Sequence, residues 1–318
     1  MASGRDDDGV SPLRGQYPAA HGAHRASGEV AAMSQAVFRH YDKRALDAEY
    51  NNRAKVKNAM EWMARYGGES ARVRAELPMR FDVPYGSHHA ERLDVFLPER
   101  SGPAPVHVFI HGGYWHRLDK TDFSFVARAF REAATVVVNY ALVPSVDLDE
   151  LVRQVRASIA WVHANAKTFG GDPDRITVSG HSAGGHLVAM LLATDWAQFG
   201  APADAVKAGC AISGLYDLEP IRLCYLNDVL ALSPEAAQRN SPVLLKPRGR
   251  APLVLTVGAD EGPEYLRQTN DLAAAWRGHG APVEIVDAPG FDHFSIIAQL
   301  ERADSTLART IRRQMGLA

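Results

Sequence analysis

Short, almost wholly apolar runs alternate with longer amphipathic stretches along most of this chain. Runs without a regular polar position are typical of parallel strands that are covered on both faces. The longest amphipathic stretch, residues 147–169, places Leu151 and Val155 on one face behind acidic residues at its amino end, which indicates a helix. We expect strands at residues 81–86, 92–98, 106–110, 135–140, 176–179, 252–257 and 283–286, and helices at residues 121–133 and 147–169.

The order of these elements predicts the fold class. Strands that alternate with helices indicate an α/β protein with a mostly parallel central sheet and helices on both faces. In such proteins the active-site residues collect at the carboxyl ends of the strands. We expect one domain over residues 31–318, preceded by a flexible tail at residues 1–30, which is rich in Gly, Ala, Pro, Ser and His.

Helix-forming residues with interspersed aromatic side chains extend from residue 37 to residue 66. This pattern predicts a helical segment near the amino end of the domain. Two interpretations stay open. The segment packs on the sheet as ordinary structure, or it forms a cap that helps to wall the active site.

A serine lies in a glycine-flanked turn after the apolar run at residues 176–179. The sequence there is Gly180-His181-Ser182-Ala183-Gly184, and a helix is expected to follow. A sharp turn from strand to helix needs small neighbours, and it leaves the serine hydroxyl exposed as a nucleophile. The pattern is short enough to arise by chance, so it needs independent support.

The run at residues 106–110 leads directly into His111-Gly112-Gly113-Tyr114-Trp115. Paired glycines at the carboxyl end of a buried strand expose backbone NH groups where acyl transfer needs donors for an oxyanion. We expect these donors to be the NH groups of Gly112 and Gly113. The NH of Ala183, the residue after the serine, is the third candidate.

A base and an acid for this serine are expected on loops after later strands. His293 follows the last strand and precedes a terminal helix, so we identify it as the base. Asp260 and Glu261 both follow the strand at residues 252–257, and either could be the acid. Only one can face His293, because neighbouring side chains on an extended backbone point to opposite sides.

Four further histidines lie near these motifs, and we expect them to be structural. His107 is within a strand and is assigned to the core. His111 is expected to orient the glycine loop through hydrogen bonds, while His181 and His186 flank the serine turn.

Aromatic residues beside the motifs are candidates for the substrate pocket. Tyr114 and Trp115 adjoin the paired glycines, and Tyr216 follows the strand that contains Cys210. They would provide a wall for a flat group, although packing in the core explains each of them equally well.

Together these motifs resemble the kynurenine formamidase (arylformamidase) branch of the α/β-hydrolases, which neighbours the hormone-sensitive-lipase-like esterases. The resemblance runs from about residue 40 onward. The segments that carry it are residues 50–53, 93–96, 111–115, 180–185, 261–268 and 292–294.

The resemblance implies an α/β-hydrolase fold and a serine carboxylesterase or arylformamidase-like hydrolase. Such an enzyme cleaves carboxylic esters or aryl amides and formamides through an acyl-enzyme, and a dedicated arylformamidase acting on N-formylkynurenine is the alternative. In this family the acid directly precedes a segment like residues 262–265, which favours Glu261. Animal members have aspartate there, so Asp260 stays open.

Composition narrows the remaining functional classes. Of the 318 residues, 46% are hydrophobic and 23% are charged, as in ordinary globular proteins. The chain has 35 Lys and Arg residues and 37 Asp and Glu residues, which gives a formal net charge of −2. This charge provides no positive field that would attract nucleic acid or anionic lipid. The amino terminus has no apolar stretch that could serve as a signal or a membrane span. With only Cys210 and Cys224, no disulfide framework is expected, which suits a cytoplasmic protein.

The sequence does not favour metal chemistry. The close histidine pairs, His21 with His24 and His88 with His89, have no suitable carboxylate partners, so we expect no metal and no cofactor. The expected partner is a small-molecule ester or amide, with a homodimer left open. A non-catalytic ligand-binding protein on the same scaffold is the alternative from another class, and it would require a damaged triad.

Overall fold

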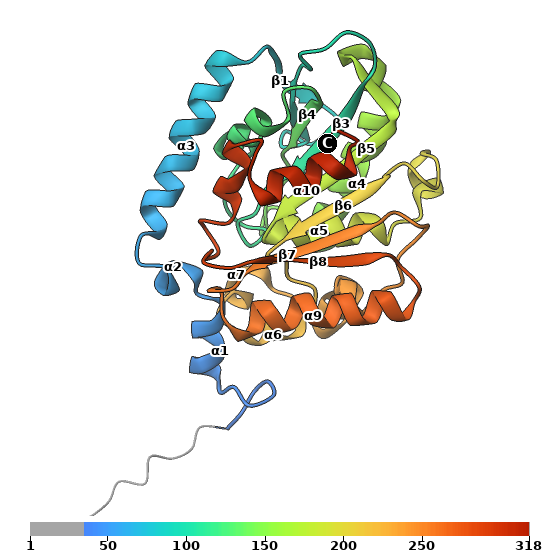
Figure 1. The fold of residues 1–318 in the computed structure, drawn as a ribbon. Helices are drawn as coiled ribbons and strands as arrows, with labels where there is room; N and C mark the ends of the chain where they lie inside the picture. The colour runs from blue at the N-terminus through green and yellow to red at the C-terminus, as the bar shows by residue number, and fades with distance from the viewer. Residues whose placement is uncertain (1–34, 318) are drawn as a thin grey trace, which may run out of the picture. The chain divides into compact units, whose positions relative to one another are not determined.

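The computed structural model describes residues 35–317, and from residue 36 onward these fold as one unit (Figure 1). The tail expected at residues 1–30 and the pair His21 and His24 lie outside the described residues. Among residues 35–317, no helix combines the length and the apolar character that crossing a bilayer requires.

An eight-stranded sheet forms the centre of the fold, in the order β1-β2-β4-β3-β5-β6-β7-β8. The pairs β1–β2 and β2–β4 are antiparallel, and the other neighbouring pairs are parallel. The mostly parallel sheet expected from the sequence is therefore confirmed. The strands are β1 (Met79–Pro84), β2 (Arg92–Phe96), β3 (Ala104–Ile110), β4 (Ala134–Val138), β5 (Gly171–His181), β6 (Ala208–Ile212), β7 (Leu253–Gly258) and β8 (Val283–Ala288).

Burial of the strands explains their apolar sequences. Every residue of β3, β4, β6 and β7 is buried, so neither face of these strands needs polar positions. β8 lies at the sheet edge and keeps exposed positions.

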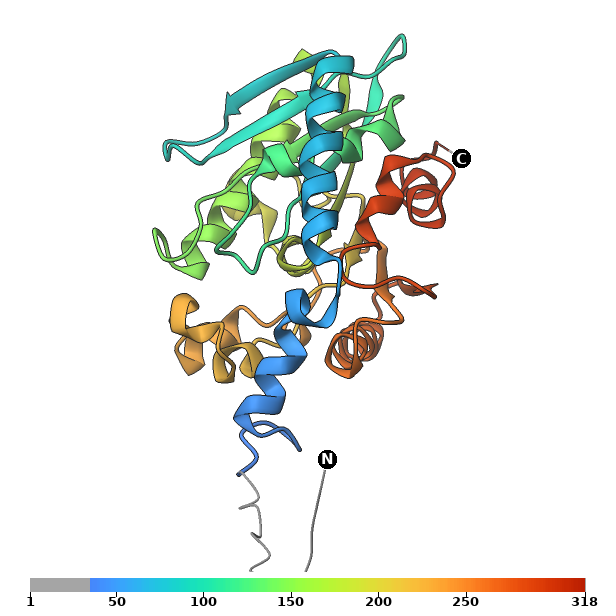
Figure 2. The same cartoon turned by 90° about the vertical axis from the view of Figure 1, so that its left-hand side faces the viewer.

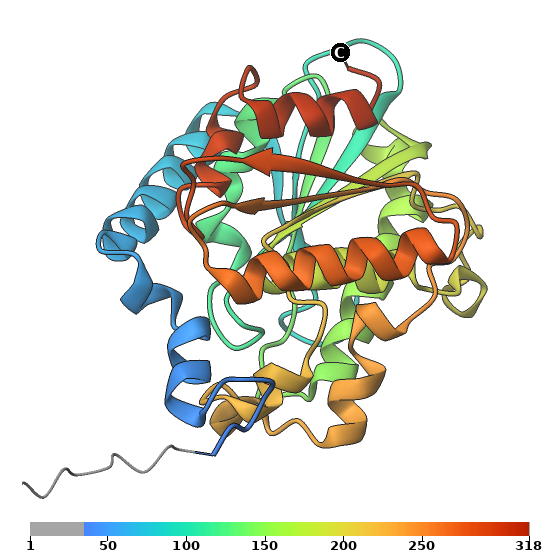
Figure 3. The same ribbon diagram turned by 60° about the horizontal axis from the view of Figure 1, so that its bottom comes forward.

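Helices cover both faces of the sheet. On one face, α4, α5 and α9 pack in a cluster with Val106, Val108 and Ile110 of β3. On the other face, α3, η2 (Ser124–Phe130) and α10 pack in a cluster with Phe109. Figure 3 shows α9 and α10 on opposite sides of β7 and β8. The helices in these layers are α3 (Ala59–Glu76), α4 (Leu148–Asn165), α5 (Ala183–Leu192), α9 (Pro263–Gly278) and α10 (Thr306–Gln314).

Shorter elements connect these layers. Between β6 and β7 the chain forms three short helices and a 3-10 turn. These elements and the other short segments are α6 (Glu219–Leu223), α7 (Asn227–Leu230), α8 (Pro234–Arg239), η3 (Ala166–Phe169), η4 (Trp196–Phe199), η5 (Pro242–Leu244) and η6 (Ile297–Glu301).

The helical segment expected at residues 37–66 forms α1 (Lys43–Tyr50), α2 (Asn52–Lys55) and the first part of α3. Figure 2 shows these helices following one another along one side of the molecule. α3 is anchored to the domain by Tyr66, whose ring stacks on Phe125 with centroids 5.3 Å apart. Ser70 of the same helix donates a hydrogen bond to the Asp122 carbonyl at 2.8 Å.

The prediction of a single helix at residues 121–133 is wrong. The chain forms two 3-10 segments there, η1 (Lys120–Asp122) and η2 (Ser124–Phe130). Phe123, Val126 and Ala129 are all buried, and a spacing of three places them on one edge of a 3-10 helix. The sequence shows the apolar character of this segment but not the tighter winding that tertiary packing selects.

Candidate active site

A serine lies at the sharp turn between β5 and α5. β5 ends at His181 and α5 begins at Ala183. Between them Ser182 has φ 58° and ψ −120°, a conformation that non-glycine residues rarely adopt and that is concentrated at functional sites. Glycine is needed two residues later, because a Cβ on Gly184 would lie 2.0 Å from the Ile110 carbonyl oxygen. The structure therefore has the geometry of a nucleophile elbow, with Ser182 at its crest.

The loop between β8 and η6 brings a histidine to this serine. His293 Nε2 lies 3.0 Å from Ser182 Oγ, and His293 Nδ1 lies 2.6 Å from Glu261 Oε2. A carboxylate can only accept, so Nδ1 donates to Glu261 and Nε2 accepts from the Ser182 hydroxyl. Asp292 shapes the loop, because its Oδ1 accepts hydrogen bonds from the backbone NH groups of Phe294 and Ser295, each at 2.8 Å. Three side chains that are far apart in the sequence thus form one hydrogen-bonded series.

The carboxylate that meets the histidine is Glu261, which is 2% exposed. Its Oε1 accepts hydrogen bonds from Ser213 Oγ at 2.5 Å and from the Gly258 NH at 2.7 Å. Asp260 is exposed and does not face His293, which excludes it as the contacting acid. The reason is a tight turn after β7, closed by a hydrogen bond from the Glu261 NH to the Gly258 carbonyl at 3.1 Å, which the sequence alone did not reveal.

The paired glycines after β3 lie against the elbow. A Cβ on Gly112 would lie 2.8 Å from the His181 carbonyl oxygen and 3.0 Å from Ser182 Cβ. Gly113 has φ +111°, a value that disfavours other residues. Within residues 35–317, neither glycine NH has a hydrogen-bond acceptor, and the NH of Ala183 opens α5 without an acceptor in its own helix. The unpaired NH groups of Gly112, Gly113 and Ala183 therefore lie on the two turns that meet at Ser182.

His111 is hydrogen-bonded to the loop that contains Gly112 and Gly113. Its Nδ1 donates to the Gly112 carbonyl at 2.8 Å, and its ring stacks on Tyr140 with centroids 4.3 Å apart. Tyr140 also donates its hydroxyl to the His111 carbonyl at 2.8 Å. Burial lowers the pKa of His111, so the ring is neutral. The orienting role expected for this histidine agrees with these contacts.

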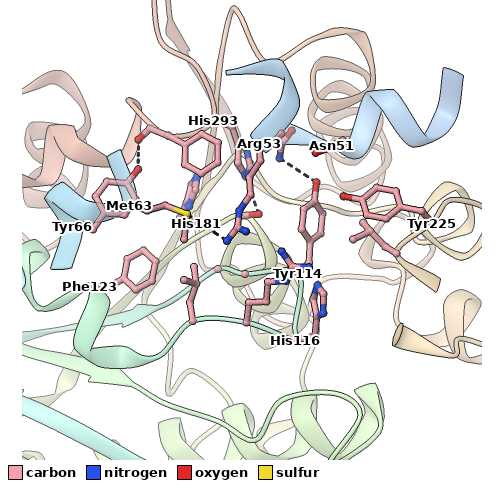
Figure 4. Close-up of a pocket in the computed structure, with 18 residues that line it drawn as sticks. Asn51, Arg53, Met63, Tyr66, Tyr114, His116, Phe123, His181, Tyr225 and His293 are labelled. Carbon is pink, nitrogen blue, oxygen red and sulfur yellow. Dashed lines mark hydrogen bonds between the residues drawn. The ribbon is translucent and has the colours of Figure 1, made fainter. Parts of the chain in front are cut away.

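Ser182 and His293 open onto a cavity of about 280 Å³ (Figure 4). Ligand pockets begin at about this size. The lining comes from the residue between α1 and α2, from α2 and α3, from the loop after β3, from the residue between η1 and η2, from the elbow, from the loop before α7 and from the loop after β8. Its residues are Asn51, Asn52, Arg53, Met63, Tyr66, Gly112, Gly113, Tyr114, His116, Arg117, Leu118, Phe123, His181, Ser182, Tyr225, Leu226, His293 and Phe294.

Of the three aromatic residues expected in the pocket, Tyr114 lines it and the other two do not. Trp115 is fully buried and donates its Nε1 hydrogen to His186 Nδ1 at 3.1 Å. Tyr216 is also fully buried and does not line the pocket. Side-chain direction in a loop depends on its backbone twist, which the sequence did not reveal. The aromatic lining that sequence reasoning missed consists of Tyr66, Phe123, Tyr225 and Phe294.

The first residue of α2 is hydrogen-bonded to residues at the pocket. Asn52 donates to the hydroxyls of Tyr114 at 3.1 Å and Tyr265 at 2.7 Å. Tyr114 in turn donates its hydroxyl to the Tyr50 carbonyl at 2.6 Å. Arg53 follows directly and lines the cavity. The amino-terminal helices therefore supply part of the pocket wall, as well as packing on the domain.

The other histidines near the site are held neutral by burial. His107 contacts Ser179 Oγ at 2.7 Å, and burial lowers its pKa to about 3. Burial also lowers the pKa of His186 to about 4. His181, expected to be structural, lines the pocket, and its ring lies 4.7 Å from that of His293. Burial and the neighbouring His293 lower the pKa of His181, so a second positive charge beside the base is avoided.

Metal ligands are not assembled in the part of the chain that the structure describes. No group of three or more His, Cys, Asp or Glu side chains in residues 35–317 is arranged to hold a metal ion.

Comparisons with known proteins agree with this geometry. Residues 93–246 match the BD-FAE family model. The kynurenine formamidase of Danio rerio is 35% identical over 253 residues, which cover 77% of this chain and 85% of that protein. The kynurenine formamidase of Salmo salar is 35% identical over 259 residues, which cover 79% and 86%.

A solved structure from Silicibacter sp. TM1040, described provisionally as a thioesterase, is also similar. It is 32% identical with a TM-score of 0.75, over 84% of this chain and 98% of that one. The fold and the resemblance expected from the sequence are both confirmed. The chain belongs to the kynurenine formamidase family and is an α/β-hydrolase.

Proposed function

We propose that this chain is a serine hydrolase that cleaves aryl formamides and small carboxylic esters through an acyl-enzyme on Ser182. The observation that carries the proposal is the hydrogen-bonded series from Ser182 through His293 to Glu261, at the floor of a cavity and beside free backbone NH groups. A nucleophile, a base and an orienting acid in this order are the recurring arrangement of acyl-transfer sites.

In the first half of the reaction, the Ser182 hydroxyl attacks the carbonyl carbon of the substrate. His293 Nε2 takes the hydroxyl proton, while Glu261 holds the ring in the required tautomer and stabilises the imidazolium. The NH groups of Gly112, Gly113 and Ala183 receive the developing oxyanion. Removal of one such donor typically slows the reaction about a hundredfold or more.

In the second half, His293 returns the proton to the leaving group, an amine from a formamide or an alcohol from an ester. The bond between carbonyl carbon and leaving group breaks, and the acyl group stays on Ser182. Water then attacks the acyl-enzyme, with its proton taken by His293 and later returned to Ser182. The acid product leaves, and the site is restored.

The cavity favours a compact acyl group with a flat leaving group. Aromatic side chains of Tyr66, Phe123, Tyr225 and Phe294 provide walls on which an aryl ring can stack. The relatives named kynurenine formamidase support a formamide as the substrate. In the alternative proposal, the enzyme is dedicated to one formamide, N-formylkynurenine.

Two measurements test this proposal. A fluorophosphonate probe should label the wild-type protein at Ser182 and fail to label Ser182→Ala. A panel of N-formylkynurenine, 4-nitrophenyl acetate and longer 4-nitrophenyl esters should then show turnover that decreases as the acyl chain lengthens. Absence of both labelling and turnover in the folded protein would favour the other class, a ligand-binding protein without catalysis.

A further inference from the structure

The loop that carries two of the oxyanion donors has an unusual backbone. Gly113 has φ +111°, and the next two residues, Tyr114 and Trp115, have positive φ values of 49° and 60°. Non-glycine residues rarely adopt this conformation, and it persists only where the surrounding contacts hold it. The direction of the Gly112 and Gly113 NH groups therefore depends on how the two aromatic side chains are held.

The two neighbouring rings are held by different parts of the molecule. Trp115 is in the core, where its Nε1 hydrogen is donated to His186. Tyr114 lies at the pocket, and in Figure 4 its hydroxyl points towards Asn51, with a dashed line that marks a hydrogen bond. The residue next to Gly113 is therefore held through a hydroxyl group at the pocket and not through burial in the core.

Three hydrogen bonds meet at the Tyr114 hydroxyl. It donates to the Tyr50 carbonyl at 2.6 Å, because a carbonyl oxygen can only accept. It therefore accepts from its other two partners, the Tyr265 hydroxyl at 2.7 Å and Asn52 Nδ2 at 3.1 Å. Asn52 Nδ2 donates its second hydrogen to the Tyr265 hydroxyl at 2.7 Å. Burial raises the pKa of Tyr114 and of Tyr265, so both hydroxyls keep their protons and this order of donors is maintained.

We call the side chains of Asn52, Tyr114 and Tyr265 the hydroxyl cluster, and it also reaches the other half of the site. Tyr265 is in the first turn of α9, soon after Glu261 in the chain. Its ring centroid lies 4.9 Å from that of His293. One set of hydrogen bonds therefore connects the loop of the oxyanion donors with the helix that follows the acid, and α2 supplies the shared donor.

We propose that the hydroxyl cluster positions the oxyanion donors: it holds Tyr114 so that the NH groups of Gly112 and Gly113 face the developing charge. The inference rests on the proposed function and adds residues that act through these NH groups. A misplacement of about 1 Å can cost about a hundredfold in rate, so a fixed loop contributes to kcat. Binding of the uncharged substrate depends less on the same NH groups, because they interact most strongly with the charge of the transition state.

Removal of one hydroxyl group tests this role. Tyr114→Phe keeps the ring in the pocket wall and removes all three hydrogen bonds. The donors remain present in a loosened loop, so the loss should be smaller than the hundredfold or more that typically follows removal of a donor. We expect kcat for 4-nitrophenyl acetate to fall about tenfold, with KM within about twofold of the wild type. A loss confined to KM would show that the hydroxyl contacts the substrate, and would overturn the positioning role.

The matched control is Tyr85→Phe. The Tyr85 side chain is also buried, and its hydroxyl donates to the Asn139 carbonyl at 2.6 Å, but it does not line the pocket. The control removes a comparable hydrogen bond from the same domain, so thermal unfolding should show a decrease in stability for both variants. We expect kcat of Tyr85→Phe to stay within about twofold of the wild type. Equal losses of kcat in Tyr85→Phe and Tyr114→Phe would overturn the inference.

Phenylboronic acid reports on the oxyanion donors directly. When it binds, the Ser182 oxygen adds to boron and His293 takes the hydroxyl proton, which leaves a tetrahedral, negatively charged boron with one oxygen at the oxyanion position. Its dissociation constant should rise about tenfold in Tyr114→Phe and stay unchanged in Tyr85→Phe. A general loss of stability would not separate the two variants, because both lose a buried hydroxyl group. An unchanged dissociation constant in Tyr114→Phe would overturn the positioning role.

Two further variants show through which residue the hydroxyl cluster acts. Asn52→Leu removes the shared donor, whereas Tyr265→Phe removes one partner of Tyr114 and leaves the bond to the Tyr50 carbonyl. We expect the loss of kcat to be largest for Tyr114→Phe and smallest for Tyr265→Phe. The double variant of Asn52 and Tyr114 should lose little more than Tyr114→Phe alone, because residues in one network are not additive. A larger loss in Tyr265→Phe would show that the cluster acts through His293, and would overturn the inference.

The wild-type protein separates this inference from the proposed function. If the wild type hydrolyses 4-nitrophenyl acetate and binds phenylboronic acid, and Tyr114→Phe equals it in both assays, the positioning role is overturned and the hydrolase stays intact. A folded wild type that neither hydrolysed the ester nor bound the boronic acid would overturn the proposed function, and the inference with it.

Discussion

Replacement of Glu261 by glutamine tests the assignment of the acid most sharply. The Gly258 NH and the Ser213 hydroxyl both donate to Glu261 Oε1, at 2.7 and 2.5 Å. A backbone NH cannot reverse its role, so the amide oxygen of glutamine must remain at this position. The amide NH₂ group is then directed at His293 Nδ1, where the native structure has an acceptor 2.6 Å away.

This reversal forces the histidine into the wrong tautomer. His293 Nδ1 must accept from the amide, so the ring proton moves to Nε2, which can no longer accept the Ser182 proton. An equivalent change of an acid to its amide in a serine protease lowers kcat about 10⁴-fold, or about 5 kcal/mol in activation free energy. We expect a loss of this order for Glu261→Gln.

The matched control is Asp260→Asn, because Asp260 adjoins Glu261 but is exposed. We expect its kcat to stay within about twofold of the wild type, as for other exposed substitutions. The assay is release of 4-nitrophenol from 4-nitrophenyl acetate, with circular dichroism to verify the fold. The reasoning would be refuted if Glu261→Gln kept more than a tenth of the activity, or if Asp260→Asn lost as much as Glu261→Gln.

Three further predictions follow from the same contacts. Ser182→Ala and His293→Ala should each abolish hydrolysis while the thermal unfolding profile stays two-state, and near-normal turnover in either would contradict the proposed roles. Ser213→Ala should lower kcat about tenfold with KM unchanged, because Oε1 of the buried Glu261 carboxylate loses one of its two donors; an unchanged kcat in steady-state assays would show that this oxygen needs only the Gly258 NH. The unfolding free energy should decrease as pH falls from 6.5 towards 4, because unfolded His107 binds a proton that the folded protein, with a pKa of about 3, does not bind. Denaturant titrations should show this pH slope reduced by about 1.4 kcal/mol per pH unit in His107→Gln, and an equal slope would contradict the buried neutral state.

The sequence was sufficient to select Ser182 and His293, because each belongs to a local pattern tied to the end of a strand. The structure places their side chains 3.0 Å apart. The residue pattern did not choose between Asp260 and Glu261, since that choice depends on how one turn closes after β7, and only the family resemblance favoured Glu261. Local turn geometry of this kind depends on backbone hydrogen bonds that residue types alone do not specify.

Pocket residues were harder to predict for a related reason. Tyr114 and Trp115 are neighbours with similar chemistry, yet one lines the cavity and the other is in the core. Arg53 and Tyr66 reach the cavity from helices that precede the sheet by sequence, so only tertiary packing brings them to Ser182. Patterns within a segment predict the elements, whereas these positions arise from contacts between distant segments.

The hydrogen bonds of Asn52 limit how many residues can be removed from the amino end of this chain without loss of the pocket. Asn52 and Tyr265 meet at 2.7 Å although 213 positions separate them. Likewise, the Tyr50 hydroxyl donates to Glu264 at 2.8 Å across 214 positions of the chain. A fragment that started at α3 would lose the hydrogen bonds that Tyr50 and Asn52 make to Glu264, Tyr265 and Gln268, at a cost of about 0.5–1.5 kcal/mol for each. Shortened versions made for crystallography or engineering therefore need to begin before α1.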